Sequence, residues 1–197
     1  MVVMSIENFD NSIFSRPLKR RALLKGGLLL GLGLALPVPA FCLPDENLSA
    51  ERAISLYNLH TGEALHDAVY WHKGAYVDET LQDLNWLLRD FRANQVKPID
   101  PNLFDLIFLL REKLCSSSPL HVISGYRSPA TNRELRKKSK GVAKHSLHIE
   151  GKAMDIRMPG CDLRNLRKAA MELQVGGVGY YPRSEFVHVD TGRVRYW

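Results

Sequence analysis

The chain is organised around the segment Ser146-Leu147-His148-Ile149-Glu150-Gly151-Lys152-Ala153-Met154-Asp155. It brings an imidazole and a carboxylate, two good ligands for first-row metal ions, close together in the sequence. On one continuous helix, His148 and Asp155 would lie about 10 Å apart along the axis, too far apart to bind one ion. We therefore expect a tight turn at Gly151 and a strand over 153–157, an arrangement that can bring the two side chains together.

A second histidine on a strand supplies the third ligand of this candidate site. The segment Phe186-Val187-His188-Val189-Asp190 alternates in the manner of a strand, so His188 and Asp190 share one face. Two imidazoles and one carboxylate form a zinc ligand set that leaves a fourth position for water, whose pKa then falls to about 7. The sequence therefore predicts a Zn²⁺ site made by His148, Asp155 and His188.

Hydrolysis of an amide at such a site also needs a base that takes the proton of the water. Glu185 suits this role only if it still lies in the turn before the strand, because a strand would direct it away from His188. Asp190 is the alternative, either as the base or as the partner that orients His188.

Strand-like and helical segments alternate along the rest of the chain. Two alternating runs predict a β-hairpin over 53–59 and 64–71, and a short apolar strand follows at 120–124. Leucines at helical spacing and capping residues predict four helices. These cover 80–91 with Asp78 as a cap, 101–114 after Asp100, 129–138 after Ser128, and 163–173 after Asp162.

Two further segments contribute candidate substrate contacts. Arg127 follows the strand at 120–124 and precedes a helix, a corner from which its guanidinium can hold a substrate carboxylate or form a structural salt bridge. The glycine-rich run Gly176-Gly177-Val178-Gly179-Tyr180-Tyr181 suggests close backbone passage near the site. We expect Tyr180 or Tyr181 to line the site and take Tyr180 as the candidate substrate contact.

Residues 1–40 are typical of an export signal. The run Lys19-Arg20-Arg21-Ala22-Leu23-Leu24-Lys25 resembles the twin-arginine motif, the apolar region 26–36 is short for a membrane span, and small residues at 38–40 allow cleavage. An uncleaved membrane anchor is the alternative. We expect a signal over 1–40, a linker over 41–52, one domain over 53–197 and no stable membrane span after cleavage.

The overall charge argues against a nucleic-acid-binding protein, and the number of cysteines argues against a disulfide-rich fold. The formal charge of +6 falls to +3 without residues 1–40, and no basic run is interleaved with aromatic residues, so we expect no nucleic-acid partner. Three cysteines argue against a disulfide framework, although Cys115 and Cys161 could pair in an oxidising compartment. None of the cysteines suits zinc ligation.

Together these motifs resemble the zinc D-Ala-D-Ala peptidases. The ten-residue stretch at 146–155, followed by a C-terminal His188, is similar to this group, which includes the VanX-like dipeptidases and the zinc-binding Hedgehog domain. The segments 124–129, 176–182 and 186–192 resemble its YcbK-like murein endopeptidase branch. The resemblance covers about residues 53–197.

The resemblance implies an α+β fold, with a small antiparallel sheet and helices packed on one side, which agrees with the order of elements above. It implies that His148, Asp155 and His188 bind Zn²⁺ and that Arg127 positions the substrate. It also implies that Glu185 is the acidic residue of an acidic-x-x-His signature, although Val187 stands where tryptophan is usual.

The implied activity is that of a periplasmic zinc metallopeptidase. Its substrates would be peptidoglycan peptides, cut at D-Ala–meso-diaminopimelate or diaminopimelate–diaminopimelate crosslinks. Two alternatives remain open. One is a non-catalytic, zinc-stabilised module that binds the cell wall or a protein. The other is a D,D- or L,D-carboxypeptidase that acts on stem peptides.

Overall fold

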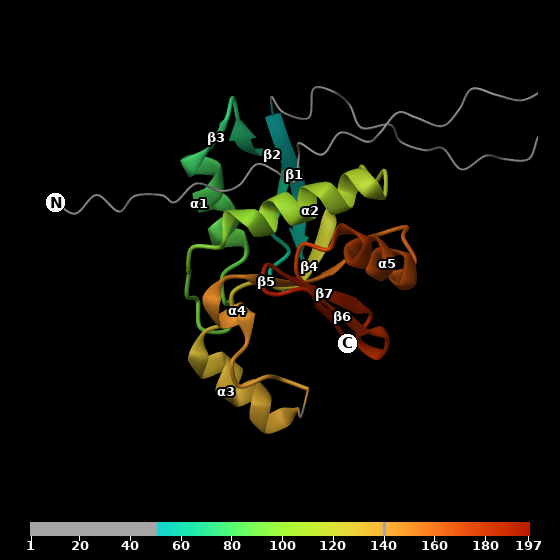
Figure 1. The fold of residues 1–197 in the computed structure, drawn as a ribbon. Helices are drawn as coiled ribbons and strands as arrows, with labels where there is room; N and C mark the ends of the chain where they lie inside the picture. Colours follow the sequence, from blue (N-terminus) through green and yellow to red (C-terminus); the bar gives the residue numbers. More distant parts are fainter. Residues whose placement is uncertain (1–50, 140) are drawn as a thin grey trace, which may run out of the picture. The chain divides into compact units, whose positions relative to one another are not determined.

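A computed structural model describes residues 51–139 and 141–197 of the chain (Figure 1). The export signal predicted over 1–40 lies outside the described residues, and so does Cys42 with most of the linker predicted over 41–52. Regular structure is already present at Glu51, where the first described strand begins.

In the described part of the chain, eight strands form one sheet in the order β3-β2-β1-β4-β5-β7-β6-β8. Neighbouring strands are antiparallel except for two parallel pairs, β1 with β4 and β6 with β8. The strand bounds are β1 Glu51–Asn58, β2 Ala64–His72, β3 Ala75–Tyr76, β4 Leu120–Ser124, β5 Ala153–Arg157, β6 Gly177–Tyr181, β7 Phe186–Asp190 and β8 Arg195–Tyr196.

The α+β class implied by the resemblance is confirmed, and the sheet is larger and more mixed than expected. The crossover through the first two helices returns the chain beside β1, so β4 runs parallel to it. After the predicted strand at 186–190, the short strand β8 adds two residues at the edge of the sheet, which the sequence did not predict. The hairpin at β1 and β2 lies where the sequence predicts it.

The helices are α1 Asp78–Leu87, α2 Pro101–Lys113, α3 Pro129–Lys138, α4 Leu147–Glu150 and α5 Leu163–Leu173. Three predicted caps are confirmed, since Asp100, Ser128 and Asp162 each accept a hydrogen bond from a backbone N–H of the first turn of α2, α3 and α5. No helix within 51–139 or 141–197 has the length and apolar character to cross a membrane.

The first helix differs from its prediction at both ends. Asp78 lies in the first turn of α1 and Val77 takes the capping position, while the helix ends at Leu87 instead of continuing to 91. The physical reason for the early end is Asp90. Its carboxylate accepts the backbone N–H groups of Arg92 and Ala93, which holds the chain in a turn after the helix.

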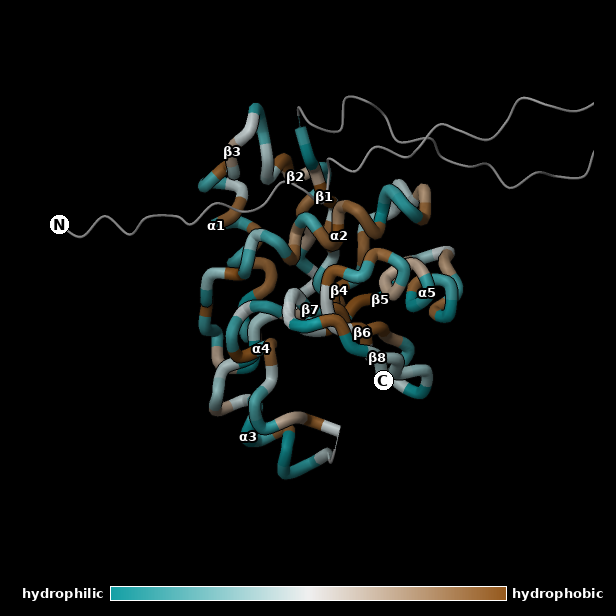
Figure 2. The backbone as a smooth tube through the Cα atoms, in the orientation of Figure 1, coloured by the Kyte–Doolittle hydropathy of each residue, from teal (hydrophilic) through white to brown (hydrophobic). Residues whose placement is uncertain are grey.

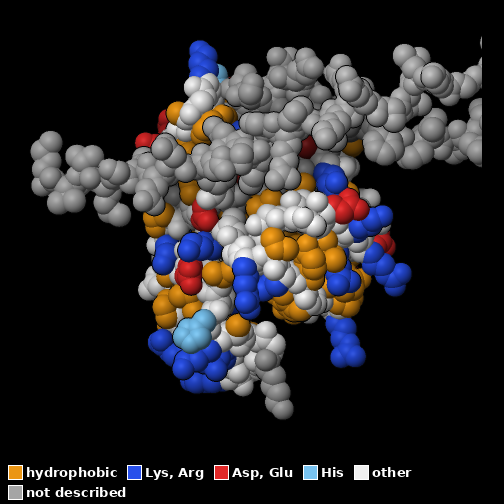
Figure 3. Space-filling model, in the orientation of Figure 1, with side chains coloured by type: hydrophobic (Ala, Val, Ile, Leu, Met, Phe, Trp, Pro, Cys, Tyr) orange, Lys and Arg blue, Asp and Glu red, His pale blue; other side chains and the backbone are white. Residues whose placement is uncertain are grey.

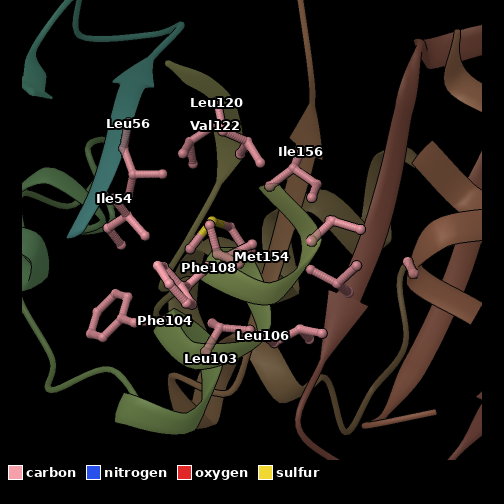
Figure 4. Close-up of a cluster of buried hydrophobic side chains, with 14 of the residues drawn as sticks. Ile54, Leu56, Leu103, Phe104, Leu106, Phe108, Leu120, Val122, Met154 and Ile156 are labelled. Carbon is pink, nitrogen blue, oxygen red and sulfur yellow. The ribbon is translucent and has the colours of Figure 1, made fainter. Parts of the chain in front are cut away.

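The hydrophobic core lies on one face of the central strands, under α2 and α5 (Figures 1 and 4). Figure 2 shows the hydrophobic colour along α2 and the central strands, and the hydrophilic colour along α3. Met154 and Ile156 of β5 point into this core, as do Val187 and Val189 of β7. Because side chains alternate along a strand, Asp155 and His188 lie on the opposite face.

Candidate metal centre

A tight turn at Gly151 places His148 beside strand β5 of the sheet. The single helical turn α4 carries His148 and ends at Gly151, whose φ of +72° is in the left-handed region that favours glycine. A Cβ atom at this position would lie 2.5 Å from the carbonyl oxygen of Pro98, so a side chain is excluded. The predicted turn at Gly151 is confirmed, while His148 itself lies on a short helix, which the sequence did not predict.

The sheet register places the other two residues. Asp155 of β5 pairs directly with His188 of β7, so their side chains leave the same face as neighbours. A register shift between Val122 and Ser124 interrupts the pairing of β4 with β5 just before this point. All three side chains are at least nine-tenths buried.

Three potential ligand atoms converge on one point. The Nε2 atom of His148 lies 3.2 Å from Asp155 Oδ1 and 3.2 Å from His188 Nδ1, and the last two atoms are 2.9 Å apart. Zinc–ligand bonds of about 2.0–2.1 Å in tetrahedral geometry separate ligand atoms by about 3.3 Å. The triangle formed by His148, Asp155 and His188 is therefore slightly tighter than one face of a zinc tetrahedron.

The remaining ring nitrogens fix which atoms can bind a metal. His148 Nδ1 lies 2.8 Å from the carbonyl oxygen of Gly125, and His188 Nε2 lies 3.0 Å from Asp190 Oδ2. Both partners can only accept, so these two nitrogens carry protons and donate. When the imidazoles are neutral, the lone pairs of His148 Nε2 and His188 Nδ1 therefore face each other and Asp155.

Asp190 supports His188 from behind. Its carboxylate is fully buried and accepts hydrogen bonds from the backbone N–H groups of Gly177 and Gly192 and a bidentate pair from Arg195. Burial raises the pKa of Asp190, but the hydrogen bonds from His188 and Arg195 outweigh it and hold the pKa well below its usual range. These contacts favour the orienting role predicted for Asp190 over the role of base.

We expect Asp190→Asn to weaken metal binding by about 10- to 100-fold, the usual effect of losing a partner that orients a metal-binding histidine. The change removes the negative charge that holds the proton on His188 Nε2 while preserving the shape of the side chain. Competition with a chromophoric chelator measures the affinity. An unchanged affinity would contradict the orienting role.

Two carboxylates surround His188. Burial lowers the pKa of His188, but hydrogen bonds to Asp155 and Asp190 outweigh it and raise the pKa to about 9. Burial lowers the pKa of His148, which is therefore neutral at pH 7. In protein freed of metal, the protonation of His188 contributes stability fully below about pH 6.5, and this contribution is lost as the pH rises through 9.

Metal binding is therefore expected to release about one proton at pH 7, because His188 Nδ1 must give up its proton to become a ligand. The release falls toward zero as the pH rises above 9, and the metal affinity increases with pH until then. Calorimetric titration of chelator-treated protein in buffers of different ionisation enthalpy measures this number. Release of no proton at pH 7 would refute the expectation.

A cavity of about 290 Å³ opens beside the three residues. Its lining includes Arg127, Tyr181, Arg195 and Trp197 together with the loop before α4. Figure 3 shows Lys and Arg side chains gathered at the end of the molecule that carries α3, which leads into this loop. The cavity and its basic surroundings suit an anionic substrate.

Arg127 lines this cavity and also contacts the cluster. One of its terminal nitrogens donates to Ser124 Oγ at 3.2 Å and to Asp155 Oδ2 at 3.4 Å, so the salt bridge that the sequence left open as an alternative is present. The buried Nε–H of Arg127 has no hydrogen-bond partner within the described residues. The side chain therefore combines a structural contact with a position on the cavity wall.

The structure corrects the expected placement of Tyr180. Its ring packs beside the guanidinium of Arg167 and lines a different hollow, formed with α5 on the other face of β6. Tyr181, the next residue on the strand, points to the metal side and lines the cavity. Both tyrosines were candidates from the sequence. Because side chains alternate along a strand, Tyr180 and Tyr181 lie on opposite faces of β6.

Glu185 lies in the turn before β7, as its proposed role requires. It follows the short 3₁₀ turn Pro182–Ser184 with a φ of +53°, and its exposed carboxylate lies 3.4 Å from Arg157 Nη1. Its sequence neighbours Ser184 and Phe186 line the cavity, whereas Glu185 itself is not among the lining residues. Cys115 and Cys161 are both free thiols.

Comparison with known proteins agrees with this geometry. The sequence profile of the Peptidase_M15_2 family, described as "Peptidoglycan L,D-endopeptidase MepK", matches residues 46–197. The chain belongs to this family. It is therefore a peptidase, and the resemblance to the murein endopeptidase branch is confirmed.

Curated members of the Peptidase_M15_2 family match nearly the whole chain. Peptidoglycan L,D-endopeptidase MepK of Escherichia coli (strain K12) is 48% identical over 179 residues, covering 91% of this chain and 96% of that protein. MepK of Shigella flexneri matches with the same identity and coverage. The probable MepK of Haemophilus influenzae (strain ATCC 51907 / DSM 11121 / KW20 / Rd) is 42% identical over 180 residues, covering 91% of this chain and 95% of that protein.

Two further residues beside the candidate metal centre, Arg195 and Trp197, were not expected from the sequence. Arg195 pairs with Asp190, and the indole of Trp197 lies 5.3 Å from the His188 ring, measured between ring centroids. Both residues belong to or follow β8, a two-residue strand without a recognisable pattern of its own. The one feature of the sequence that could have indicated Trp197 is Gly179, because a glycine there leaves room for a large side chain beside His188.

Proposed function

We propose that this chain is a zinc-dependent peptidoglycan endopeptidase that acts outside the cytoplasmic membrane. The observation that carries the proposal is the convergence of two imidazole nitrogens and one carboxylate oxygen within 3.2 Å of one another in a member of a peptidase family. The substrate class is supported by its relatives, which are named peptidoglycan L,D-endopeptidases.

The donor set suits zinc better than a harder divalent ion. Magnesium and calcium prefer six or more oxygen ligands, whereas His148 and His188 supply two nitrogens and Asp155 a single oxygen. A zinc ion held by these residues would polarise the carbonyl group and lower the pKa of a bound water. The cavity beside the three residues leaves an open side for the substrate.

Arg127 would hold the substrate at this site. Its buried Nε–H has no partner within the described residues, and its guanidinium lies on the cavity wall against Asp155. From the cavity wall, the guanidinium of Arg127 can donate hydrogen bonds to a substrate carboxylate or carbonyl oxygen. The salt bridge to Asp155 fixes the direction in which the guanidinium points.

Glu185 is our candidate for the general base. The carboxylate of Asp190 is buried behind His188 and already accepts hydrogen bonds from four groups, so it has no path to a water in the cavity. Glu185 is exposed in the turn between Ser184 and Phe186, which both line the cavity, and its 3.4 Å contact with Arg157 is a weak surface pair. Rotation of the Glu185 side chain away from Arg157 would let it accept the proton of the attacking water.

The relatives' names also favour one kind of crosslink. An L,D-endopeptidase cuts a bond between an L and a D centre, which describes a diaminopimelate–diaminopimelate crosslink. A D-Ala–diaminopimelate crosslink joins two D centres. We therefore propose the former bond as the substrate of this chain.

Export by the twin-arginine route would deliver the peptidase to the periplasm after folding, with its metal already bound. The motif at 19–25 supports this part of the proposal. Blocking twin-arginine export while leaving the general secretory route intact tests it. Arrival of the protein in the periplasm under that block would refute the route alone.

The experiment for the activity offers purified protein two crosslinked muropeptide dimers, one with each type of crosslink. We expect the diaminopimelate–diaminopimelate dimer to be split into monomers and the other dimer to survive. Release of a single terminal amino acid would instead identify a carboxypeptidase.

A further inference from the structure

One wall of the metal cavity is built by Trp197. Gly179 pairs with His188 across β6 and β7, so a side chain at 179 would lie beside the histidine. The indole occupies that space, because a Cβ atom on Gly179 would lie 2.6 Å from Trp197 Cε2. Backbone hydrogen bonds with Val178 and Tyr180 anchor Trp197 along β6, and the guanidinium of Arg195 stacks on its ring.

The indole also orients the hydroxyl group of Tyr181. Trp197 Nε1 donates a hydrogen bond to the Tyr181 oxygen at 2.8 Å. An indole N–H cannot accept, so the tyrosine oxygen is the acceptor in this bond and its own proton is free to point elsewhere. The ring of Tyr181 stacks on Phe186 with 4.5 Å between centroids, which restrains its position.

The Tyr181 side chain lies on the wall of the metal cavity. Tyr181 and Trp197 both line it together with Arg127 and the three residues of the metal cluster. The hydrogen bond from Trp197 holds the Tyr181 oxygen on this wall of the cavity. Tyr181 therefore offers a hydrogen-bond donor whose oxygen has a restrained position.

We propose that Tyr181, oriented by Trp197, donates a hydrogen bond to the carbonyl oxygen of the scissile peptide bond. This rests on the proposed function. As water adds to the carbonyl carbon and gives one proton to the base, the π electron pair moves to the carbonyl oxygen, and the Tyr181 O–H stabilises the resulting negative charge without transferring its own proton. When the pair returns, the C–N bond breaks and the leaving amine takes a proton from the base. Tyr181 is thus a catalytic residue and Trp197 a positioning residue.

The test compares Tyr181→Phe, Trp197→Phe and the double variant with wild-type protein of equal zinc content. Loss of one such donor costs about 100- to 1000-fold in kcat, so we expect a fall of this size in Tyr181→Phe with KM changed by less than about threefold. Trp197→Phe should lower kcat by about tenfold in the wild-type background and should have no further effect in Tyr181→Phe. Tyr180→Phe, the same chemical change on the other face of β6, is the matched control.

Two readouts do not depend on turnover. A phosphinate analogue of the crosslink carries an oxygen in place of the developing oxyanion, and its affinity should fall with kcat in Tyr181→Phe. The NMR signal of the Trp197 indole N–H should shift in Tyr181→Phe and stay in place in Tyr180→Phe. The inference would be overturned if Tyr181→Phe had the same kcat and the same affinity for the analogue as the wild type. A wild-type protein that cuts no crosslinked dimer would overturn the proposed function instead.

Discussion

Replacing His188 with alanine is expected to abolish peptidase activity and to lower zinc affinity by more than about 100-fold. That loss exceeds the usual effect of removing a partner that only orients a metal ligand, because His188 supplies one of three ligand atoms. Zinc content after dialysis and cleavage of crosslinked muropeptides are the two measurements. Asp190 and Arg195 would remain, so the variant removes the ligand without removing its supports.

The matched control for this variant is His66→Ala. His66 is an exposed histidine on β2, a strand at the far side of the sheet order from β7. It should retain wild-type zinc content and activity. If His188→Ala kept stoichiometric zinc, the assignment of His188 as a ligand would be wrong, and activity without zinc would exclude the metallopeptidase mechanism.

Glu185→Gln is expected to lower kcat by about 100- to 10,000-fold while leaving zinc bound, which is the usual contribution of a general base. The amide keeps the size of the side chain and loses the ability to take a proton. Among residues 51–139 and 141–197, the exposed carboxylate forms a surface pair with Arg157, so we expect the fold to be unaffected. Steady-state kinetics and zinc content on the same preparation measure both properties.

Glu150→Gln serves as the control for Glu185→Gln, since Glu150 is also exposed and pairs with a neighbouring surface lysine. Its activity should equal that of the wild type. Full activity in Glu185→Gln would show that another group takes the proton of the water. In that case the role predicted for Glu185 from its acidic-x-x-His spacing would not apply to this chain.

Local chemistry made much of the fold predictable. Asp100, Ser128 and Asp162 precede helices and cap them, and the alternating run at 186–190 forms a strand with the predicted faces. Spacing excluded a continuous helix through the ligand stretch and required the turn that Gly151 makes. The convergence of His148, Asp155 and His188 follows from this turn together with strand alternation.

Long-range contacts account for what the sequence did not reveal. The end of α1 depends on Asp90, which caps a turn and also accepts the backbone N–H of Ser128. Whether Tyr180 or Tyr181 faces the metal centre depends on the register of β6 with β7, which is a property of the assembled sheet. Trp197 reaches the site through the parallel pairing of β8 with β6, which no local pattern encodes.

Zinc-dependent peptidase activity is tested by offering a diaminopimelate–diaminopimelate crosslinked dimer to the purified protein before chelation, after chelation and after return of zinc. We expect splitting into monomers, complete loss of cleavage on chelation, and recovery with one zinc per chain. Stoichiometric zinc binding with the dimer left intact would contradict this expectation, and would identify the protein as a zinc-stabilised module that binds the wall without cutting it.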